Sequence, residues 1–174
     1  MLASSSFALL VGMVLDQQIP MERAFIAPYL LAQRIGGELT PQRLLEMDIA
    51  EVERVFGEKP ALHRFPASMA KRVLEVARIV VDAYQGDAGA IWRDASDGDD
   101  LMKRLTSLPG FGKDKAKIFT ALLGKQVGLE VPGWQRACEP FGQEGTFMSV
   151  ADIVDADSMT QVRNFKQAMK AAKK

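Results

Sequence analysis

The sequence is short of the residues that build metal sites and disulfide frameworks. Its 174 residues include one cysteine, Cys138, and one histidine, His63. A single cysteine excludes a disulfide framework within the chain, a cysteine-rich zinc site and a four-cysteine iron–sulfur cluster. No apolar run is long enough to span a bilayer, and the apolar start lacks the basic segment of a signal peptide. A reducing cytosol fits this composition.

The chain also lacks an excess of charge of either sign. Lys and Arg number 22, as do Asp and Glu, so the net charge is zero. Dedicated nucleic-acid binders are often strongly basic, and the total therefore gives no support for that function. The distribution is uneven, because residues 103–125 carry six basic residues and one acid, Asp114. A local basic patch and a solvated helix surface are both compatible with this run.

Strand-like alternation is absent, and the hydrophobic pattern is helical almost throughout. Apolar residues recur at helical spacing in "FALLVGMVLDQQ" (7–18) and along 69–84. Thr40 and Asp48 are predicted to cap helices, and Pro20 to occupy the first position of another. Residues 158–174 predict an amphipathic helix with a basic tail. We therefore predict an all-α, multi-helix fold, with a central helical lobe over 20–95 and a second lobe formed by 1–19 and 96–174.

The stretch "LPGFGKDKAKIF" (108–119) predicts a tight turn between two helices. Pro109 ends the first helix, and Gly110 and Gly112 permit positive φ and close approach of another molecule's backbone. The next helix begins with free N–H groups and the positive end of its dipole, which together favour an anion. With Lys113 and Lys115 at its mouth, this turn has the pattern of a helix-hairpin-helix motif that grips a phosphate without reading sequence. The alternative is an ordinary helix connection with a glycine cap.

Beyond this hairpin, most of the chain resembles the helix-hairpin-helix DNA glycosylase superfamily, called HhH-GPD. "LLVGMVLDQQIPMERA" (9–24), "LTPQRLLEMDIAEVERVFG" (39–57) and "LTSLPGFGKDKAKIFTALLG" (105–124) carry the resemblance. More narrowly, "MVLDQQIPME", "KPALHRFPASMAKRV" and "LPGFGKDKAKIFTALLGKQ" resemble a small, cluster-free bacterial branch of actinobacterial type. The resemblance implies two helical lobes around a cleft, and enzymes that flip a nucleotide and cleave its N-glycosidic bond.

The resemblance and the basic loop 58–67 together define the candidate DNA-binding residues. In the superfamily a glutamine fills the gap left by the flipped base, which implies Gln18 or its neighbour Gln17. The loop "EKPALHRFPA" offers basic side chains for phosphates, and an apolar residue, Leu62 or Phe65, to wedge a base step. The candidates are Leu108, Pro109, Gly110, Phe111, Gly112, Lys113, Lys115, Gln17, Gln18, Lys59, His63, Arg64 and Lys71.

The chain departs from the superfamily at its catalytic positions. The expected aspartate, in a V-D-T-H-like string, falls where this chain has Pro132 or Gly133. The lysine that bifunctional members carry in the hairpin is replaced by Asp114, so Schiff-base chemistry is not matched. Glu130 is the nearest carboxylate to the missing aspartate, and a solvated surface position is its alternative role. The catalytic residue is therefore left unassigned.

These observations predict a DNA base-excision repair protein that binds double-stranded DNA at a damaged or abasic site. We expect a monofunctional DNA N-glycosylase, a hydrolase that removes a damaged base. The alternative is a catalytically inactive DNA-binding or damage-sensing module on the same fold. We further expect a monomer in the cytoplasm, associated with the nucleoid. No metal or resident cofactor is expected, and a monovalent cation at the hairpin is left open.

Overall fold

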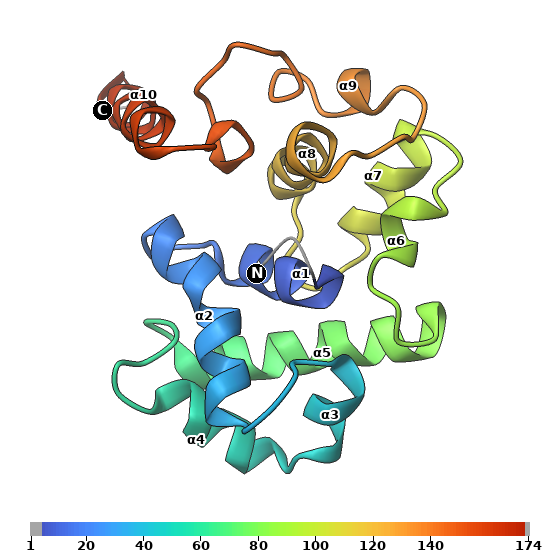
Figure 1. The fold of residues 1–174 in the computed structure, drawn as a ribbon, viewed down its shortest axis with the longest axis vertical. Coiled ribbons are helices and arrows are strands. Elements are labelled where there is room, and N and C mark those ends of the chain that lie inside the picture. The colour runs from blue at the N-terminus through green and yellow to red at the C-terminus, as the bar shows by residue number, and fades with distance from the viewer. Residues whose placement is uncertain (1–4, 173–174) are drawn as a thin grey trace. The chain divides into compact units, whose positions relative to one another are not determined.

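The computed structural model of the protein describes residues 5–172, and every regular element in that range is helical (Figure 1). The all-α fold predicted from the sequence is confirmed. The elements are α1 (Ser6–Leu15), α2 (Met21–Arg34), α3 (Pro41–Glu46), α4 (Ile49–Gly57), α5 (Pro66–Tyr84), α6 (Ala90–Arg93), α7 (Gly98–Thr106), α8 (Lys113–Leu122), the π-helical η2 (Leu123–Val127), α9 (Trp134–Ala137), the 3-10 helix η3 (Val150–Asp152) and α10 (Ala156–Ala172).

The described chain forms two compact units. The first contains the residues up to 91 together with 108–110, and the second contains 92–107 and the residues from 111 onward. In this division α1 belongs with α2 and α5, whereas the sequence-based division grouped residues 1–19 with the hairpin half. The arrangement of two lobes around a cleft stays a prediction.

The first unit is built around α1, which is buried on all its faces. Its residues from Leu9 to Leu15 are all buried, which is why this helix is apolar rather than amphipathic. It packs closely against α2, where a Cβ on Gly12 would lie 2.9 Å from a ring carbon of Phe25. The helix α5 packs on α3 and α4 and contacts α1. The apolar residues 7–15 therefore form a core helix.

Capping residues define several helix starts in this unit. The Thr40 hydroxyl accepts a hydrogen bond from Arg43 N at 3.2 Å, and the Asp48 carboxylate accepts one from Ala50 N at 2.8 Å. Both predicted caps are confirmed. Pro20 lies one position earlier than expected, because it is the N-cap residue of α2 and not its first helical residue.

The second unit has an aromatic centre on α8. Phe119 is fully buried, and its ring makes edge-on contacts with Trp92 and Phe111, with centroids 5.6 Å and 5.8 Å away. These contacts attach α8 to the segment before α7 and to the end of the hairpin turn. Within residues 5–172, no helix combines the length and apolar character needed to span a membrane.

Candidate nucleic-acid interface

The hairpin turn joins α7 and α8 through two buried residues, two half-buried residues and one exposed glycine. Leu108 and Phe111 are 3% and 4% exposed and anchor the turn, while Gly112 lies at the surface. Gly110 has a φ of +84°, a conformation that favours glycine. The sequence included Leu108 and Phe111 among the DNA-binding residues, but their burial leaves them a supporting role. The exposed part of the turn is what a phosphate can reach.

Gly112 is the N-cap residue of α8 and provides no side-chain cap. Its φ is −75°, and a Cβ placed there would meet no atom within 4 Å. The start of α8 therefore combines an open approach with backbone N–H groups and a positive dipole end. Lys113 is exposed beside it, and Lys115 lies over the Phe111 ring, with Nζ 5.9 Å from the centroid. This arrangement has the chemistry of an anion site.

In the first unit, Gly110 lies against the side chain of Arg72 on α5. A Cβ on this glycine would be 2.7 Å from Arg72 Cδ, so a larger residue would have to displace the Arg72 side chain. The sequence offered both Lys71 and Arg72 as phosphate contacts, and the list of candidates contained Lys71. Lys71 Nζ lies 3.5 Å from a Glu53 carboxylate oxygen, across an exposed ion pair. Arg72 is thus the basic residue next to the turn, and the helical pattern alone did not distinguish it from its neighbour.

The basic loop between α4 and α5 is held rigidly to the first unit. Arg34 donates hydrogen bonds to Val55 O and Pro60 O at 2.9 Å and 2.8 Å, and Arg23 donates one to Ala61 O. Such anchoring fixes the loop's backbone, which is the condition for a loop to present side chains at defined positions.

His63 lies inside this loop and not on its surface. It is 1% exposed, and its Nδ1 accepts a hydrogen bond from Phe65 N at 3.0 Å. The proton is therefore on Nε2, which donates to Gln17 O at 2.9 Å. The sequence makes His63 a DNA-binding candidate, but neither ring nitrogen is available for DNA in this placement, because both are used within the chain. Its observed role is to tie the loop to the turn after α1.

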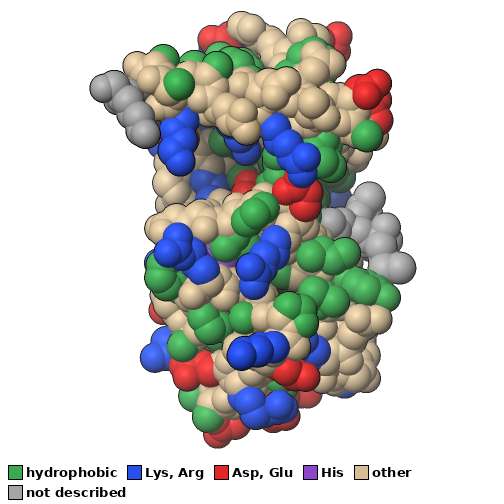
Figure 2. Space-filling model, turned by 90° about the vertical axis from the view of Figure 1, so that its left-hand side faces the viewer, with side chains coloured by type: hydrophobic (Ala, Val, Ile, Leu, Met, Phe, Trp, Pro, Cys, Tyr) green, Lys and Arg blue, Asp and Glu red, His purple; other side chains and the backbone are tan. Residues whose placement is uncertain are grey.

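Outward-facing loop residues remain available for DNA. Phe65 is 44% exposed, and the Arg64 guanidinium stacks over its ring at 4.9 Å from the centroid. Leu62 is 1% exposed, which leaves Phe65 as the apolar residue at the loop surface. Figure 2 shows one face of the molecule, where Lys and Arg side chains are scattered among hydrophobic ones and do not merge into a single basic patch.

The turn after α1 separates the two candidate glutamines. The Gln17 amide donates to Val14 O and to Met69 Sδ, both at 3.2 Å, and its side chain is held against the unit. Gln18 is exposed and has a φ of +55°, a conformation that residues other than glycine rarely adopt. Of the two alternatives, Gln18 is the one whose side chain lies at the surface.

The segment in the place of the superfamily aspartate offers no carboxylate. Pro132 O accepts a hydrogen bond from Gly98 N at 2.8 Å, and Gly133 has a φ of +74°. A Cβ on Gly98 would lie 2.6 Å from Gly133 O, so this turn packs tightly against the start of α7. Glu130 is exposed, as expected for a solvated surface residue.

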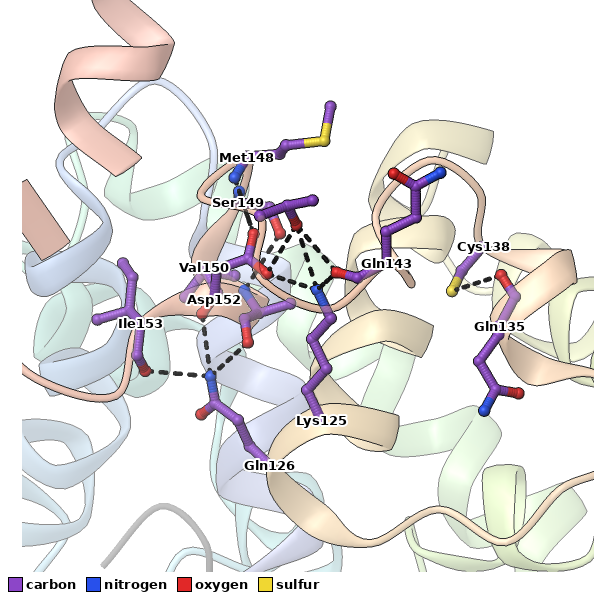
Figure 3. Close-up of polar contacts among 12 residues, drawn as sticks. Lys125, Gln126, Gln135, Cys138, Gln143, Met148, Ser149, Val150, Asp152 and Ile153 are labelled. Atoms are coloured by element: carbon purple, nitrogen blue, oxygen red, sulfur yellow. Dashed lines mark hydrogen bonds and ion pairs between the residues drawn. The ribbon is translucent and has the colours of Figure 1, made fainter. Parts of the chain in front are cut away.

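The most buried carboxylate in the described part of the second unit belongs to Asp152, and its oxygens already accept hydrogen bonds from other residues of the chain (Figure 3). Its side chain is 3% exposed and pairs with Lys125 Nζ at 2.5 Å. It also accepts hydrogen bonds from Met148 N at 2.8 Å, Ser149 N at 3.0 Å and the Thr146 hydroxyl at 3.3 Å. A carboxylate with this many donors is a structural anchor for residues 146–152 and has no lone pair to spare for activating water.

An open groove of about 690 Å³ in the first unit contains two other carboxylates. Pro109 of the hairpin turn forms one side, and apolar residues of α3, α4 and α5 line much of the remainder. Glu75 and Asp82 on α5 border the groove, in alternation with Lys71 and Arg78. Glu75 and Asp82 are therefore the carboxylates of the groove that Pro109 borders.

The helical architecture and the hairpin define a helix-hairpin-helix protein of the DNA-binding kind. The family model described as HhH-GPD superfamily base excision DNA repair protein matches residues 11–174. Because the match covers most of the chain, this protein belongs to the HhH-GPD superfamily of base excision DNA repair proteins. No curated protein and no solved structure matches the chain significantly. The superfamily predicted from the sequence is confirmed, and the bacterial branch stays a prediction.

Proposed function

We propose that this protein holds damaged or abasic double-stranded DNA through its phosphates, and that binding is the function its geometry supports best. The observation that carries the proposal is the start of α8, where Gly112 leaves the helix uncapped and open to solvent. Lys113 adds positive charge there. A phosphate bound at this point receives backbone hydrogen bonds and dipole stabilisation without any sequence being read.

The first unit supplies the side chains that would act on the base stack. Phe65 is the apolar wedge and Arg64 a phosphate contact, while Gln18 enters the space left by a displaced base. Lys59 adds a basic group on the same loop. Wedging costs a few kcal/mol per base step and is least costly where the duplex is already damaged, which gives a preference for lesions without base-specific contacts.

Catalysis has weaker support than binding. Removal of a base needs a carboxylate that stabilises positive charge on the sugar or activates water. The resemblance puts Pro132 or Gly133 at the superfamily position, Glu130 is exposed, and Asp152 is saturated by its own donors. The module that senses or shields damage is therefore the first candidate.

A monofunctional DNA N-glycosylase is the second candidate, and the groove beside Pro109 is the observation that favours it. Glu75 and Asp82 place carboxylates there, within the same unit as residues 108–110 of the turn. Base removal through them would be hydrolysis, because Asp114 stands where a Schiff-base lysine would be.

The decisive experiment measures release of free bases by mass spectrometry from alkylated, oxidised and deaminated duplexes held with excess protein. Tight binding to an abasic-site duplex without release supports the sensing module. Release that is lost in Glu75→Gln/Asp82→Asn, and kept in the surface control Glu38→Gln/Glu51→Gln, supports the glycosylase. Absence of both binding and release would refute the proposal.

The same proposal includes a monomer that works in the cytoplasm at the nucleoid. It includes no resident metal or cofactor. A monovalent cation at the hairpin would have to be held by backbone carbonyls of residues 108–112, since that segment contains no acidic side chain. Sedimentation with and without duplex DNA would test the monomer.

A further inference from the structure

We propose that the exposed basic ridge of α10, formed by Arg163, Lys166 and Lys170, is a second contact for the DNA phosphate backbone. This inference rests on the proposed DNA-binding function and extends it to an element outside the hairpin. The three residues are exposed, and helical geometry places them within an arc of about 60° around the helix axis.

The ridge is one-sided in charge. The acidic residue of α10, Asp157, projects about 150° away from its centre. Lys166 and Lys170 make no ion pair with an acid in the described part of the chain. In a chain with 22 basic and 22 acidic residues, this is a local excess of positive charge. Two exposed lysines on one helix face, without an acidic partner among the described residues, match a polyanion.

The start of α10 is capped by its own residues and packed on the second unit through Val162. Val162 is fully buried, and Ser158 N donates to the Asp155 carboxylate at 2.7 Å. The Ser158 hydroxyl in turn accepts hydrogen bonds from Val154 N and Asp155 N at 3.0 Å and 2.9 Å. Because this end is anchored, the ridge has a defined position within its unit and is not a loose tail.

The dimensions of the ridge suit a nucleic-acid strand. Arg163 and Lys170 are separated by about 10 Å along the helix axis, at a rise of about 1.5 Å per residue. A duplex carries about one charge per 3.4 Å on each strand, so this length faces about three phosphates. Long basic side chains reach such a row without close backbone approach, and the contact needs no base recognition.

A membrane surface is the competing partner for a basic helix. Interfacial helices need a broad apolar face rich in large residues such as Trp, Phe and Leu. On the outer half of α10, Phe165 is partly buried and Met169 is the large apolar side chain that is exposed, at 46%. That apolar surface is too small for stable insertion, which favours DNA.

The test compares Lys166→Gln/Lys170→Gln with the wild type in binding to a duplex that contains a stable abasic-site analogue. Binding is measured between 50 and 200 mM NaCl. Loss of two phosphate contacts should reduce the slope of log K against log salt by about 1.8. Gln has nearly the helix propensity of Lys, so helicity should be retained. Lys166→Arg/Lys170→Arg should keep the wild-type slope.

A matched control removes the same charge elsewhere, through Arg54→Gln/Arg136→Gln, at two exposed residues of α4 and α9. The inference would be overturned if Lys166→Gln/Lys170→Gln kept the wild-type slope of log K against log salt. It would also be overturned if its slope fell only as much as that of the control. If Gly112→Ala abolishes binding while the Lys166/Lys170 pair changes nothing, the ridge is refuted and the proposed function stands. If the wild type does not bind DNA, both fail. Lysine-dependent binding to phosphatidylserine vesicles with an unchanged DNA slope would assign the ridge to membranes and overturn it.

Discussion

Replacing Gly112 by alanine separates DNA binding from folding. The residue has a φ of −75°, which alanine adopts without strain, and its Cβ would point into open space. Alanine is a poorer N-cap than glycine, by about 0.5–1 kcal/mol, but it also restricts the unfolded chain and recovers about 0.4–1 kcal/mol. The free energy of unfolding should therefore change by less than about 1 kcal/mol.

DNA binding should respond much more strongly to Gly112→Ala. The added methyl group enters the open space at the start of α8, where we place the phosphate. Loss of one hydrogen bond to a charged group costs about 1.5–3 kcal/mol, which corresponds to about 10- to 150-fold in affinity. Fluorescence anisotropy with an abasic-site duplex at fixed salt gives the affinity, and urea unfolding gives the stability.

Gly110→Ala should reduce the stability of the fold more than it reduces the affinity for DNA. This residue has a φ of +84°, and its new Cβ would lie 2.7 Å from Arg72 Cδ. The backbone strain is about 1–2 kcal/mol, whereas the Arg72 side chain can move aside. The melting temperature should fall by several degrees, at about 2–4 °C per kcal/mol.

Gly57→Ala serves as the matched control, because a Cβ on Gly57 also meets nothing within 4 Å and this glycine ends α4, outside the proposed interface. It should bind DNA as the wild type does. Wild-type affinity in folded Gly112→Ala, or a loss of affinity no larger than its loss of stability, would refute the phosphate site at α8.

Three further predictions concern the second unit. Lys125→Met leaves the buried Asp152 carboxylate without its partner and should cost about 3–5 kcal/mol of unfolding free energy, so an unchanged urea midpoint would contradict the role of the pair. Hydrogen bonds from Ser158 lower the pKa of the Asp155 carboxyl group in the folded protein. The unfolded state therefore binds the proton more readily than the folded state. The folding stability that this carboxylate contributes is fully present above the ordinary Asp pKa of about 4, and it is lost as the pH falls through the lowered pKa. Ser158→Ala should reduce the difference in melting temperature between pH 7 and pH 3, and an equal difference would count against this linkage. Burial raises the pKa of the Cys138 thiol to about 11, so a thiol reagent at pH 8 should react only after unfolding in urea, and rapid labelling of the native protein would refute its burial.

Local chemistry explains what could be predicted from the sequence. The caps at Thr40 and Asp48 and the tight turn at Gly110 depend on residues within a few positions of each other, and all are present in the structure. That Pro132 or Gly133 falls where the superfamily has its aspartate stays a prediction from the resemblance. Helical class and the hairpin turn therefore follow from the sequence.

Other features depend on which segments pack together, and only the tertiary structure decided them. Burial of His63 and exposure of Gln18 result from the docking of the 58–65 loop beside the turn after α1. Arg72 meets Gly110 although 38 positions separate them, and Lys125 meets Asp152 across 27. Spacing along the chain assigns a residue to a face of its own helix, but the partner of that face is set by contacts between distant segments. The sequence by itself therefore determined the class of fold and the tight turn between α7 and α8, while tertiary packing decided which candidate side chains lie at the surface.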